Sequence, residues 1–283
     1  MRADIIQDID PNARLDIATR PIPFLQRLYA MPALRRVLVV ALLATIWQIY
    51  ASWLQNPLMV PTLSDTLEAF VTDMASGLLP QRVGVSLRVL LTGYVMGVAL
   101  AAVLNGLAAT SLLGNSLLDT LTSMLNPLPA IALLPLALLW FGVGEGSLLF
   151  VLLHAVTWVV AMNTHAGFQS VSATLRMVGR NYGLSQIGYV TRILVPAAFP
   201  SILSGLKIGW AFAWRTLVAA ELVFGASSGK GGLGWYIFQN KNELEIANVF
   251  AGLLTVILIG LAVDSLVFKQ IENRTLRRWG MQA

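Results

Sequence analysis

The chain has 283 residues, of which 57% are hydrophobic and only 12% are charged, and its formal net charge is +5. Soluble domains carry roughly 25% charged residues, so this composition excludes an ordinary soluble domain and indicates a membrane protein. The sequence contains no cysteine, which excludes disulfide bonds and thiolate metal sites.

Basic residues lie at the ends of apolar segments rather than in one cluster. Arg35 and Arg36 precede the first apolar segment, and Lys269 and Arg274 follow the last one. Basic residues beside membrane spans mark the cytoplasmic side. Retention at the inner leaflet therefore explains the positive charge better than nucleic-acid binding does, and both termini are expected to be cytoplasmic.

The apolar segments predict an all-α membrane protein with six transmembrane helices. Residues 1–33 are polar and lack the apolar core of a cleavable signal, so we expect a cytoplasmic tail there. The transmembrane domain is expected over residues 34–279, followed by a short tail at 280–283. The expected spans are 37–54, 85–108, 117–141, 148–167, 202–224 and 249–268.

Residues 55–82 are too polar to cross a membrane, but they contain an amphipathic helical pattern. Thr62 or Ser64 can cap this helix. Its apolar face is expected to carry Leu63, Leu67, Phe70, Val71, Met74 and Leu78. The helix either lies on the outer membrane surface or packs against its own protein.

Small residues recur at a spacing of four in two of the spans. Such rows let helix backbones approach closely within a membrane, where apolar side chains alone give no preference for protein over lipid. We therefore expect both rows to pack against other helices. They consist of Gly93, Gly97 and Ala101 in the second span and of Gly205, Gly209 and Ala213 in the fifth.

The third expected span contains Pro127, Pro129 and Pro135. Each proline frees a backbone carbonyl, which a membrane interior tolerates only against protein or a watery cavity. A helix broken at mid-depth is therefore a candidate wall of a translocation pathway. Kinking for helix packing explains the prolines equally well.

The fifth span contains Trp214, Arg215 and Glu221 within apolar sequence. Ionisable groups at membrane depth are costly and usually face a cavity or one another. A separation of six residues places Arg215 and Glu221 on different helix faces, so they are not expected to pair. Arg215 either adds positive potential to a translocation route, with Glu221 organising an outer gate, or it is structural. A structural Arg215 would bind carbonyls freed at Pro129 or Pro135, or a side chain of another span.

Nucleotide, metal and catalytic signatures are lacking in the sequence. The segment 225–233 differs from a phosphate-binding loop, because only three residues separate Gly225 from Gly229 and because Gly231 follows Lys230. His154 and His165 lack partners at ligand spacing and are expected to be packed or hydrogen-bonded. We therefore expect neither an enzyme nor a cofactor in this chain.

Residues 172–200, which we call the basic loop, contain three arginines and no acidic residue. Residues 181–185 are typical of a turn between two short helices, and Pro196 is expected to stop the second helix. The basic loop resembles the cytoplasmic EAA loop of ABC-importer permeases. Gly183 occupies the position of the loop glycine, and Ile193–Pro196 that of the closing I-x-L-P motif. The E-A-A triplet falls on Met177, Val178 and Gly179, so the family's glutamate is absent.

The resemblance extends over about residues 55–279. The segments that resemble permeases of the nitrate, sulfonate and taurine group are Ser86–Leu90, Pro127–Pro135, Leu139–Gly144 and Ala213–Glu221. The resemblance implies a type I ABC importer fold in a bacterial inner membrane. It also implies transport of a small anionic or zwitterionic solute.

That resemblance further implies several partners. They are a second permease chain, expected to form a homodimer, two cytoplasmic ATP-binding subunits that use ATP and magnesium, and a periplasmic or lipid-anchored substrate-binding protein. In this scheme the basic loop supplies the coupling helix that sits in a groove of the ATPase. The implied coupling residues are Met177, Val178, Gly179, Gly183, Leu184 and Pro196. We expect the ATPase contacts of Met177, Val178 and Leu184 to be apolar. A secondary transporter or channel acting alone, and a membrane scaffold, are the alternatives.

Overall fold

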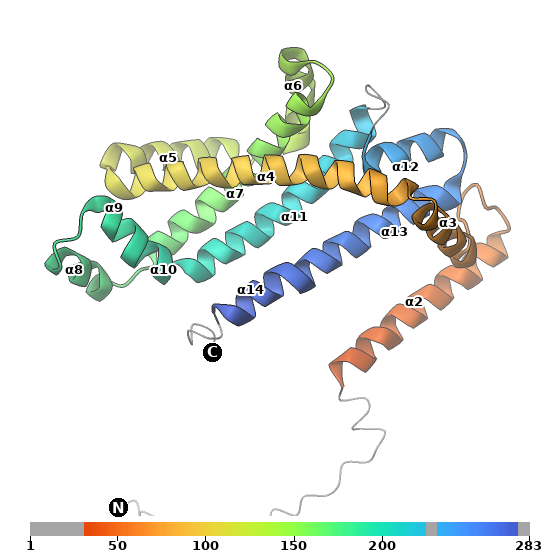
Figure 1. Cartoon of the computed structure of the whole chain (residues 1–283), viewed down its shortest axis with the longest axis horizontal. Helices are drawn as coiled ribbons and strands as arrows, with labels where there is room; N and C mark the ends of the chain where they lie inside the picture. Colours follow the sequence, from red (N-terminus) through yellow and green to blue (C-terminus); the bar gives the residue numbers. More distant parts are fainter. Residues whose placement is uncertain (1–30, 225–230, 277–283) are drawn as a thin grey trace, which may run out of the picture. The chain divides into compact units, whose positions relative to one another are not determined.

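The computed structural model describes residues 31–224 and 231–276 (Figure 1). In these residues all regular secondary structure is helical, which confirms the all-α prediction. The chain divides into two units, residues 1–50 and 51–283, and each is described by itself. The described part of the first unit consists of helix α2 up to Tyr50.

The helices have the following bounds, with 3₁₀ and π segments labelled η. They are α2 (Pro32–Leu54), α3 (Leu63–Ala75), α4 (Leu78–Thr110), α5 (Leu112–Leu125), η1 (Ala130–Leu133), α6 (Leu134–Phe141), α7 (Glu145–Gln169), α8 (Ala173–Asn181), α9 (Gln186–Tyr189), η2 (Val190–Leu194), α10 (Val195–Ala197), α11 (Phe199–Phe224), α12 (Leu233–Asn242), α13 (Ile246–Ala262), η3 (Val263–Phe268) and α14 (Lys269–Arg274).

Four of the helical segments are long and apolar enough to cross a membrane: Ala33–Leu54, Leu78–Thr110, Glu145–Gln169 and Ile246–Arg274. Two further candidates are bent pairs. The helices Leu112–Leu125 and Ala130–Phe141 meet at 87°, and Gln186–Ala197 and Phe199–Val223 meet at 76°. The number of spans rises from four to six if each bent pair counts as one. The predicted count of six therefore stays a prediction.

The amphipathic helix expected after the first span is α3, and Thr62 caps it. The Thr62 hydroxyl accepts a hydrogen bond from the Asp65 backbone N–H at 3.1 Å, and the Asp65 carboxylate accepts one from the Thr62 N–H at 3.3 Å. This reciprocal pair satisfies two donors that a helix start leaves free. The expectation that Leu78 shares this helix was wrong, because Gly77 adopts φ +82° and α4 begins after it.

Helix α3 buries polar residues and exposes several apolar ones. Thr66 and Asp73 are buried, whereas Leu67, Val71 and Met74 are exposed on this chain. Helix α3 packs against α4 and α13, and Phe70 of its apolar face is partly buried against the apolar core, so only part of that face points outward. The outward part, with Leu67, Val71 and Met74, fits contact with lipid at a membrane surface.

Helix α7 packs against both α4 and α11 (Figure 1). The glycine row of α4 faces one side of α7: a Cβ atom built on Gly97 would lie 2.7 Å from the Cβ of Val156. The glycine row of α11 meets the same line of α7 residues one turn further along, where a Cβ atom on Gly209 would lie 2.9 Å from Cγ2 of Val160 and 3.7 Å from Cγ1 of Val156. Contacts this short leave no room for a side chain, so only glycine allows these backbones to approach so closely.

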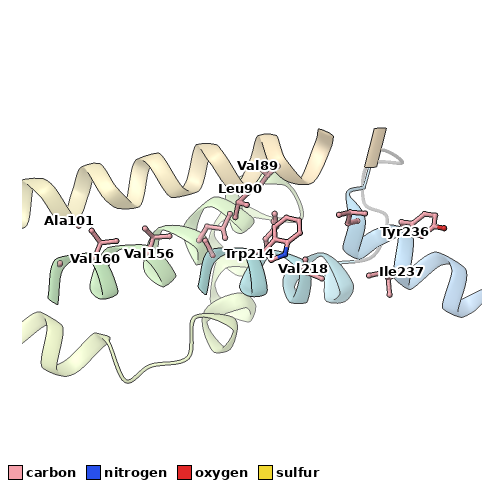
Figure 2. Close-up of a cluster of buried hydrophobic side chains, with 14 of the residues drawn as sticks. Val89, Leu90, Ala101, Val156, Val160, Trp214, Val218, Tyr236 and Ile237 are labelled. Carbon is pink, nitrogen blue, oxygen red and sulfur yellow. The ribbon is translucent and has the colours of Figure 1, made fainter. Parts of the chain in front are cut away.

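The other members of both rows lie in the same two seams. A Cβ atom on Gly93 would lie 2.7 Å from the Cβ of Leu152, and one on Gly205 would lie 2.8 Å from the Cβ of Asn163. Ala101 and Ala213 are fully buried in the same core. Figure 2 shows the resulting apolar layer, which continues from α7 to Trp214, Val218, Tyr236 and Ile237.

Helix α12 was not expected from the sequence, because residues 234–247 look polar. Within it Leu233, Tyr236 and Ile237 are buried, and α12 packs against α11 and α13. A Cβ atom on Gly252 of α13 would lie 2.7 Å from Cγ1 of Ile237, so the two helices are closely apposed. The segment 225–230, which contains most of the rejected phosphate-loop pattern, lies outside the described residues.

Candidate functional site

The basic loop folds into α8, a turn, α9, η2 and α10 (Figure 1). Gly183 lies in the turn with φ +63°, and nothing lies within 4 Å of a Cβ atom built on it. The turn therefore uses a conformation that favours glycine, although a side chain at this position would meet no neighbour among the described residues. A partner that approaches the turn would find bare backbone there.

Apolar side chains of the basic loop are exposed on this chain. The exposed fractions are 56% for Met177, 81% for Tyr182 and 74% for Ile187, and Val178 is also exposed. Exposed apolar residues that lie close together mark a surface for a protein partner or for the membrane. The sequence analysis had not singled out Tyr182 and Ile187, although an aromatic residue next to the turn glycine was a usable signal.

The other three coupling residues implied by the resemblance are Gly179, Leu184 and Pro196, and they differ from one another in how deeply they are buried. Gly179 is buried, and a Cβ atom on it would lie 2.7 Å from Cδ2 of Tyr189, so it packs inside the loop. Leu184 is half-buried. Pro196 is exposed and lies within α10, so it does not stop the preceding helix as expected. The helix instead runs on from α9 through η2 and Pro196, and the chain bends only after Ala197.

The span that contains the prolines is broken between α5 and η1. Pro127 and Pro129 lie in the break, whereas Pro135 lies in the first turn of α6, where a missing N–H interrupts no helical hydrogen bond. A cavity of about 320 Å³ opens at this point, and we call it the break cavity. Its lining consists of Asn126, Pro127, Leu128, Pro129, Ala130, His154, Ala155, Trp158, Val159 and Phe212.

His154 of α7 satisfies a carbonyl in the break. Its Nε2 lies 3.2 Å from the Leu128 carbonyl oxygen, and its Nδ1 accepts a hydrogen bond from Trp158 Nε1 at 3.0 Å. Since Nδ1 is an acceptor, the proton belongs on Nε2, which donates to Leu128. The carbonyl at the break is therefore satisfied by histidine and not by arginine. His165 lies elsewhere on α7, where its Nε2 is 3.3 Å from the Asp119 carboxylate.

Arg215 is exposed on this chain and contacts its own helix. Its Nε donates to the Ala211 carbonyl at 3.0 Å, and its guanidinium carbon lies 5.1 Å from the centre of the Phe212 ring. Phe212 also lines the break cavity. The guanidinium thus lies near one wall of that cavity, with no carboxylate within ion-pair distance among the described residues. The neighbouring Trp214 points to another helix, α13, where its buried indole N–H donates a hydrogen bond to the Val256 carbonyl at 3.2 Å.

Glu221 lies at the other end of α11 and is only 5% exposed. Its carboxylate accepts a hydrogen bond from the Ser86 hydroxyl, at 2.8 Å and 2.9 Å from the two oxygens, and one from the Gly234 N–H at 2.8 Å. Ser86 in turn accepts a bond from the Leu233 N–H at 2.8 Å. We call these residues, with Gly232, the Glu221 cluster. It ties α4, α11 and the start of α12 together.

The Glu221 cluster requires glycine at two positions. A Cβ atom on Gly232 would lie 2.1 Å from Ser86 Oγ and 2.3 Å from Glu221 Oε1, and one on Gly234 would lie 2.5 Å from the Cβ of Glu221. Arg82, one turn before Ser86, donates from Nη1 to the Gly231 carbonyl at 2.9 Å. The sequence analysis named Glu221 but none of its partners, because no local pattern connects a serine of α4 with glycines 146 and 148 positions later.

A second polar group lies beside α12. The Tyr236 hydroxyl donates a short hydrogen bond to the Asp73 carboxylate, and the Asn248 amide donates to the same oxygen at 3.2 Å. Burial raises the pKa of the Tyr236 phenol, and the hydrogen bond and negative charge of Asp73 raise it further. Tyr236 therefore stays protonated and can act as a donor at any physiological pH. This contact links α3, α12 and α13.

Comparison with known proteins agrees with these features. Residues 93–274 match the family of binding-protein-dependent transport system inner membrane components. The chain is 30% identical over 239 residues to the putative aliphatic sulfonates transport permease protein SsuC of Escherichia coli, covering 84% of this chain and 88% of that protein. It is 31% identical over 255 residues to the nitrate import permease protein NrtB of Synechocystis, covering 87% and 90% of the two chains. It is 31% identical over 231 residues to the taurine transport system permease protein TauC of Escherichia coli, covering 79% and 82%.

The family match covers most of the chain, including the basic loop, the broken span and both glycine rows. Members of this family are multi-pass inner-membrane subunits that form a pathway and do not hydrolyse ATP themselves. The resemblance inferred from the sequence motifs is thereby confirmed. The chain belongs to the binding-protein-dependent transport system inner membrane components and is an ABC importer permease of the nitrate, sulfonate and taurine type.

Proposed function

We propose that this chain forms the membrane pathway through which a small anionic or zwitterionic solute is imported by ATP-driven alternating access. Two such chains would associate with two cytoplasmic ATP-binding subunits, which hold ATP and magnesium. A periplasmic or lipid-anchored protein would deliver the solute. The names of the relatives, which refer to sulfonates, nitrate and taurine, support this class of solute.

The exposed apolar surface of the basic loop is the observation that carries this proposal. Met177 and Ile187 are exposed on short helices between two long apolar helices, and Tyr182 is exposed in the turn next to bare backbone at Gly183. Interfaces with partners concentrate such aromatic and apolar side chains at their centres. We assign Met177, Val178, Leu184 and the Gly183 turn to ATPase contact, and Gly179 to packing within the loop. The loop and both termini would then be cytoplasmic.

The break cavity supports a pathway through this part of the chain. Its volume of about 320 Å³ is large enough for a nitrate or a small sulfonate. Its walls come from the break in the proline-containing span, from α7 and from α11. Arg215 beside Phe212 would supply positive potential without forming a tight site, because its guanidinium is exposed. A moderate attraction suits an importer, which must release its solute.

Alternating access requires one element with two arrangements that the partners stabilise to different extents. In this proposal ATP-driven closure of the ATPase pair moves the basic loops and turns the pathway outward, and hydrolysis returns it. The Glu221 cluster would hold the opposite end of α11 against α4 and α12. Its role would be to define the outer gate and not to bind the solute.

Uptake by the complete complex in proteoliposomes tests this function. The complex would contain this chain, its ATPase and its binding protein, and the solutes would be taurine, an alkanesulfonate and nitrate. We expect uptake of at least one of them that requires both ATP and the binding protein. A complex whose ATPase cannot hydrolyse ATP is the matched control. Uptake by this chain alone, driven by an ion gradient, would instead identify a secondary transporter.

A further inference from the structure

The guanidinium of Arg176 joins the basic loop to the end of α7. Its Nη2 donates to the carbonyls of Phe168 at 2.8 Å and of Gln169 at 3.2 Å, and its Nε donates to the carbonyl of Val171 at 3.1 Å. Arg176 itself lies in the first half of α8. One side chain of the basic loop thus makes three hydrogen bonds, two to the last turn of α7 and one to Val171, two residues after the end of α7.

These bonds have a clear physical basis. The last carbonyls of a helix lack partners within the helix and carry its negative partial charge. A guanidinium is always charged and presents its donors in a rigid fork, so it can bind several of these carbonyls in one fixed direction. Only Ser170, Val171 and Ser172 separate α7 from α8. Arg176 thus fixes the direction of this short connection, whose Phe168 and Val171 are also buried in a cluster with Leu194 and Ala198.

The other end of the basic loop joins α11 differently. There α9 continues through the π segment η2 and the three-residue α10, and the chain then bends by 76° into α11. The side chain of Arg192 on η2 is exposed. A π segment and a sharp bend are typical of places where a helix can bend or act as a hinge. The two connections of the loop therefore differ: the one to α7 is clamped, and the one to α11 is bent.

Helix α7 is also the helix that reaches the break cavity. Phe168, which accepts the shortest bond from Arg176, and His154, which binds the Leu128 carbonyl in the break, lie on the same continuous helix. Their separation of 14 positions corresponds to about 21 Å along the axis. Because both glycine rows bury α7 tightly, the helix would move as a rigid rod with little internal bending.

We propose that Arg176 is a positioning residue that fixes the basic loop to α7, so that a movement of the loop is delivered through α7 to the break cavity. This inference rests on the proposed function, because it assumes that an ATPase moves the loop. It assigns the transmission to one side chain and one helix. The sequence analysis had counted Arg176 only as part of the basic charge of the loop.

The test compares Arg176→Gln with Arg192→Gln in the complete complex. Both variants remove one positive charge from the same loop, but only the first removes the bonds to α7. The measurements are assembly by size-exclusion chromatography, basal ATPase activity, and solute imported per ATP hydrolysed. We expect both variants to assemble and to keep basal ATPase activity. For Arg176→Gln the solute imported per ATP should fall about tenfold, as is typical for loss of a charged hydrogen bond. For Arg192→Gln it should stay unchanged.

Arg176→Lys separates geometry from charge. A lysine keeps the charge but lacks the fork, so its ratio of import to hydrolysis should lie between those of the wild type and Arg176→Gln. Full recovery with lysine would overturn the proposal, because charge alone would then be sufficient. A wild-type ratio in Arg176→Gln, or a failure of both Arg176 variants to assemble, would also overturn it. A wild-type complex that imports nothing with ATP would contradict the proposed function itself.

Discussion

The Glu221 cluster and the basic loop differ in which side chains they bury: the cluster buries a carboxylate, whereas the loop exposes apolar side chains. In the cluster, a carboxylate is 5% exposed and receives hydrogen bonds from a hydroxyl and a backbone N–H. In the basic loop, Met177 and Ile187 are exposed, and no described residue comes within 4 Å of a Cβ atom built on Gly183. A buried polar group with its bonds made fixes one arrangement of helices. An exposed apolar group makes few contacts within the chain, so it does not fix the arrangement of helices until a partner binds to it.

This contrast separates two kinds of substitution. Changes in the Glu221 cluster remove interactions that exist in the isolated chain, so they should lower its stability. Changes on the exposed surface of the basic loop remove surface offered to a partner, so they should impair coupling more than they lower stability. The predictions below test this division, and they are ordered from the largest expected effect to the smallest.

Glu221→Ala should have the largest effect on stability. It leaves the Gly234 N–H without its acceptor, removes a partner of Ser86, and creates a space between α4, α11 and α12. Loss of one partner of a buried charged network costs about 3 kcal/mol or more. The midpoint of thermal unfolding in detergent measures this loss. Glu221→Gln, which keeps one acceptor oxygen, is the matched control and should lose less. An unchanged midpoint for Glu221→Ala would contradict a structural role for the cluster.

Gly97→Leu and Gly209→Leu should destabilise the chain to a somewhat smaller extent. Each adds a side chain where even a Cβ atom would lie within 3 Å of α7, and such overpacking costs about 1–3 kcal/mol or more. Expression level and thermal midpoint are the measurements. Gly106→Leu is the matched control on α4, because nothing lies within 4 Å of a Cβ atom at that position. If all three variants behave alike, close approach in the glycine seams does not matter for folding.

Gly183→Glu should change coupling more than stability. The substitution places a carboxylate on the exposed turn and costs about 1–2 kcal/mol for a left-handed backbone conformation. We expect membrane insertion to continue and either ATPase association or the dependence of hydrolysis on solute to be lost. Gly77→Glu is the control, because Gly77 also has a positive φ, +82°, and open space but lies outside the basic loop. Normal ATP-driven uptake by Gly183→Glu would refute the assignment of this turn to the ATPase contact.

Arg215→Gln should have the smallest effect. The guanidinium is exposed and contacts its own helix, so its removal should not lower assembly or the thermal midpoint. If Arg215 adds positive potential to the pathway, the preference for anionic over zwitterionic solutes should fall about fivefold, the equivalent of about 1 kcal/mol. Competition uptake in proteoliposomes measures it, with Arg88→Gln, an exposed arginine of α4, as control. Lower assembly and stability with an unchanged preference would make Arg215 a structural residue.

Much of this protein follows from its sequence alone. Composition determined the membrane class, the small-residue spacing indicated where helices approach closely, and the prolines predicted where a span breaks. The motifs around Pro127 and Arg215 determined the family. Each of these signals is local, because a period, a proline or a short motif lies within one helix or one loop. The positions of Gly97 and Gly209 along their helices could therefore be recognised without knowledge of what they face.

The tertiary structure alone decided which of these local features meet. Ser86 and Glu221 are 135 positions apart, and the break carbonyl of Leu128 meets His154 from another helix. Helix α12 forms from a polar-looking segment because burial of Tyr236 against α11 and α13 outweighs its weak local pattern. Gly179, expected at a partner contact, packs inward because Tyr189 folds back onto it. Hydrogen bonds and close contacts between distant segments depend on how helices pack, and helical periodicity contains no information about which helices become neighbours.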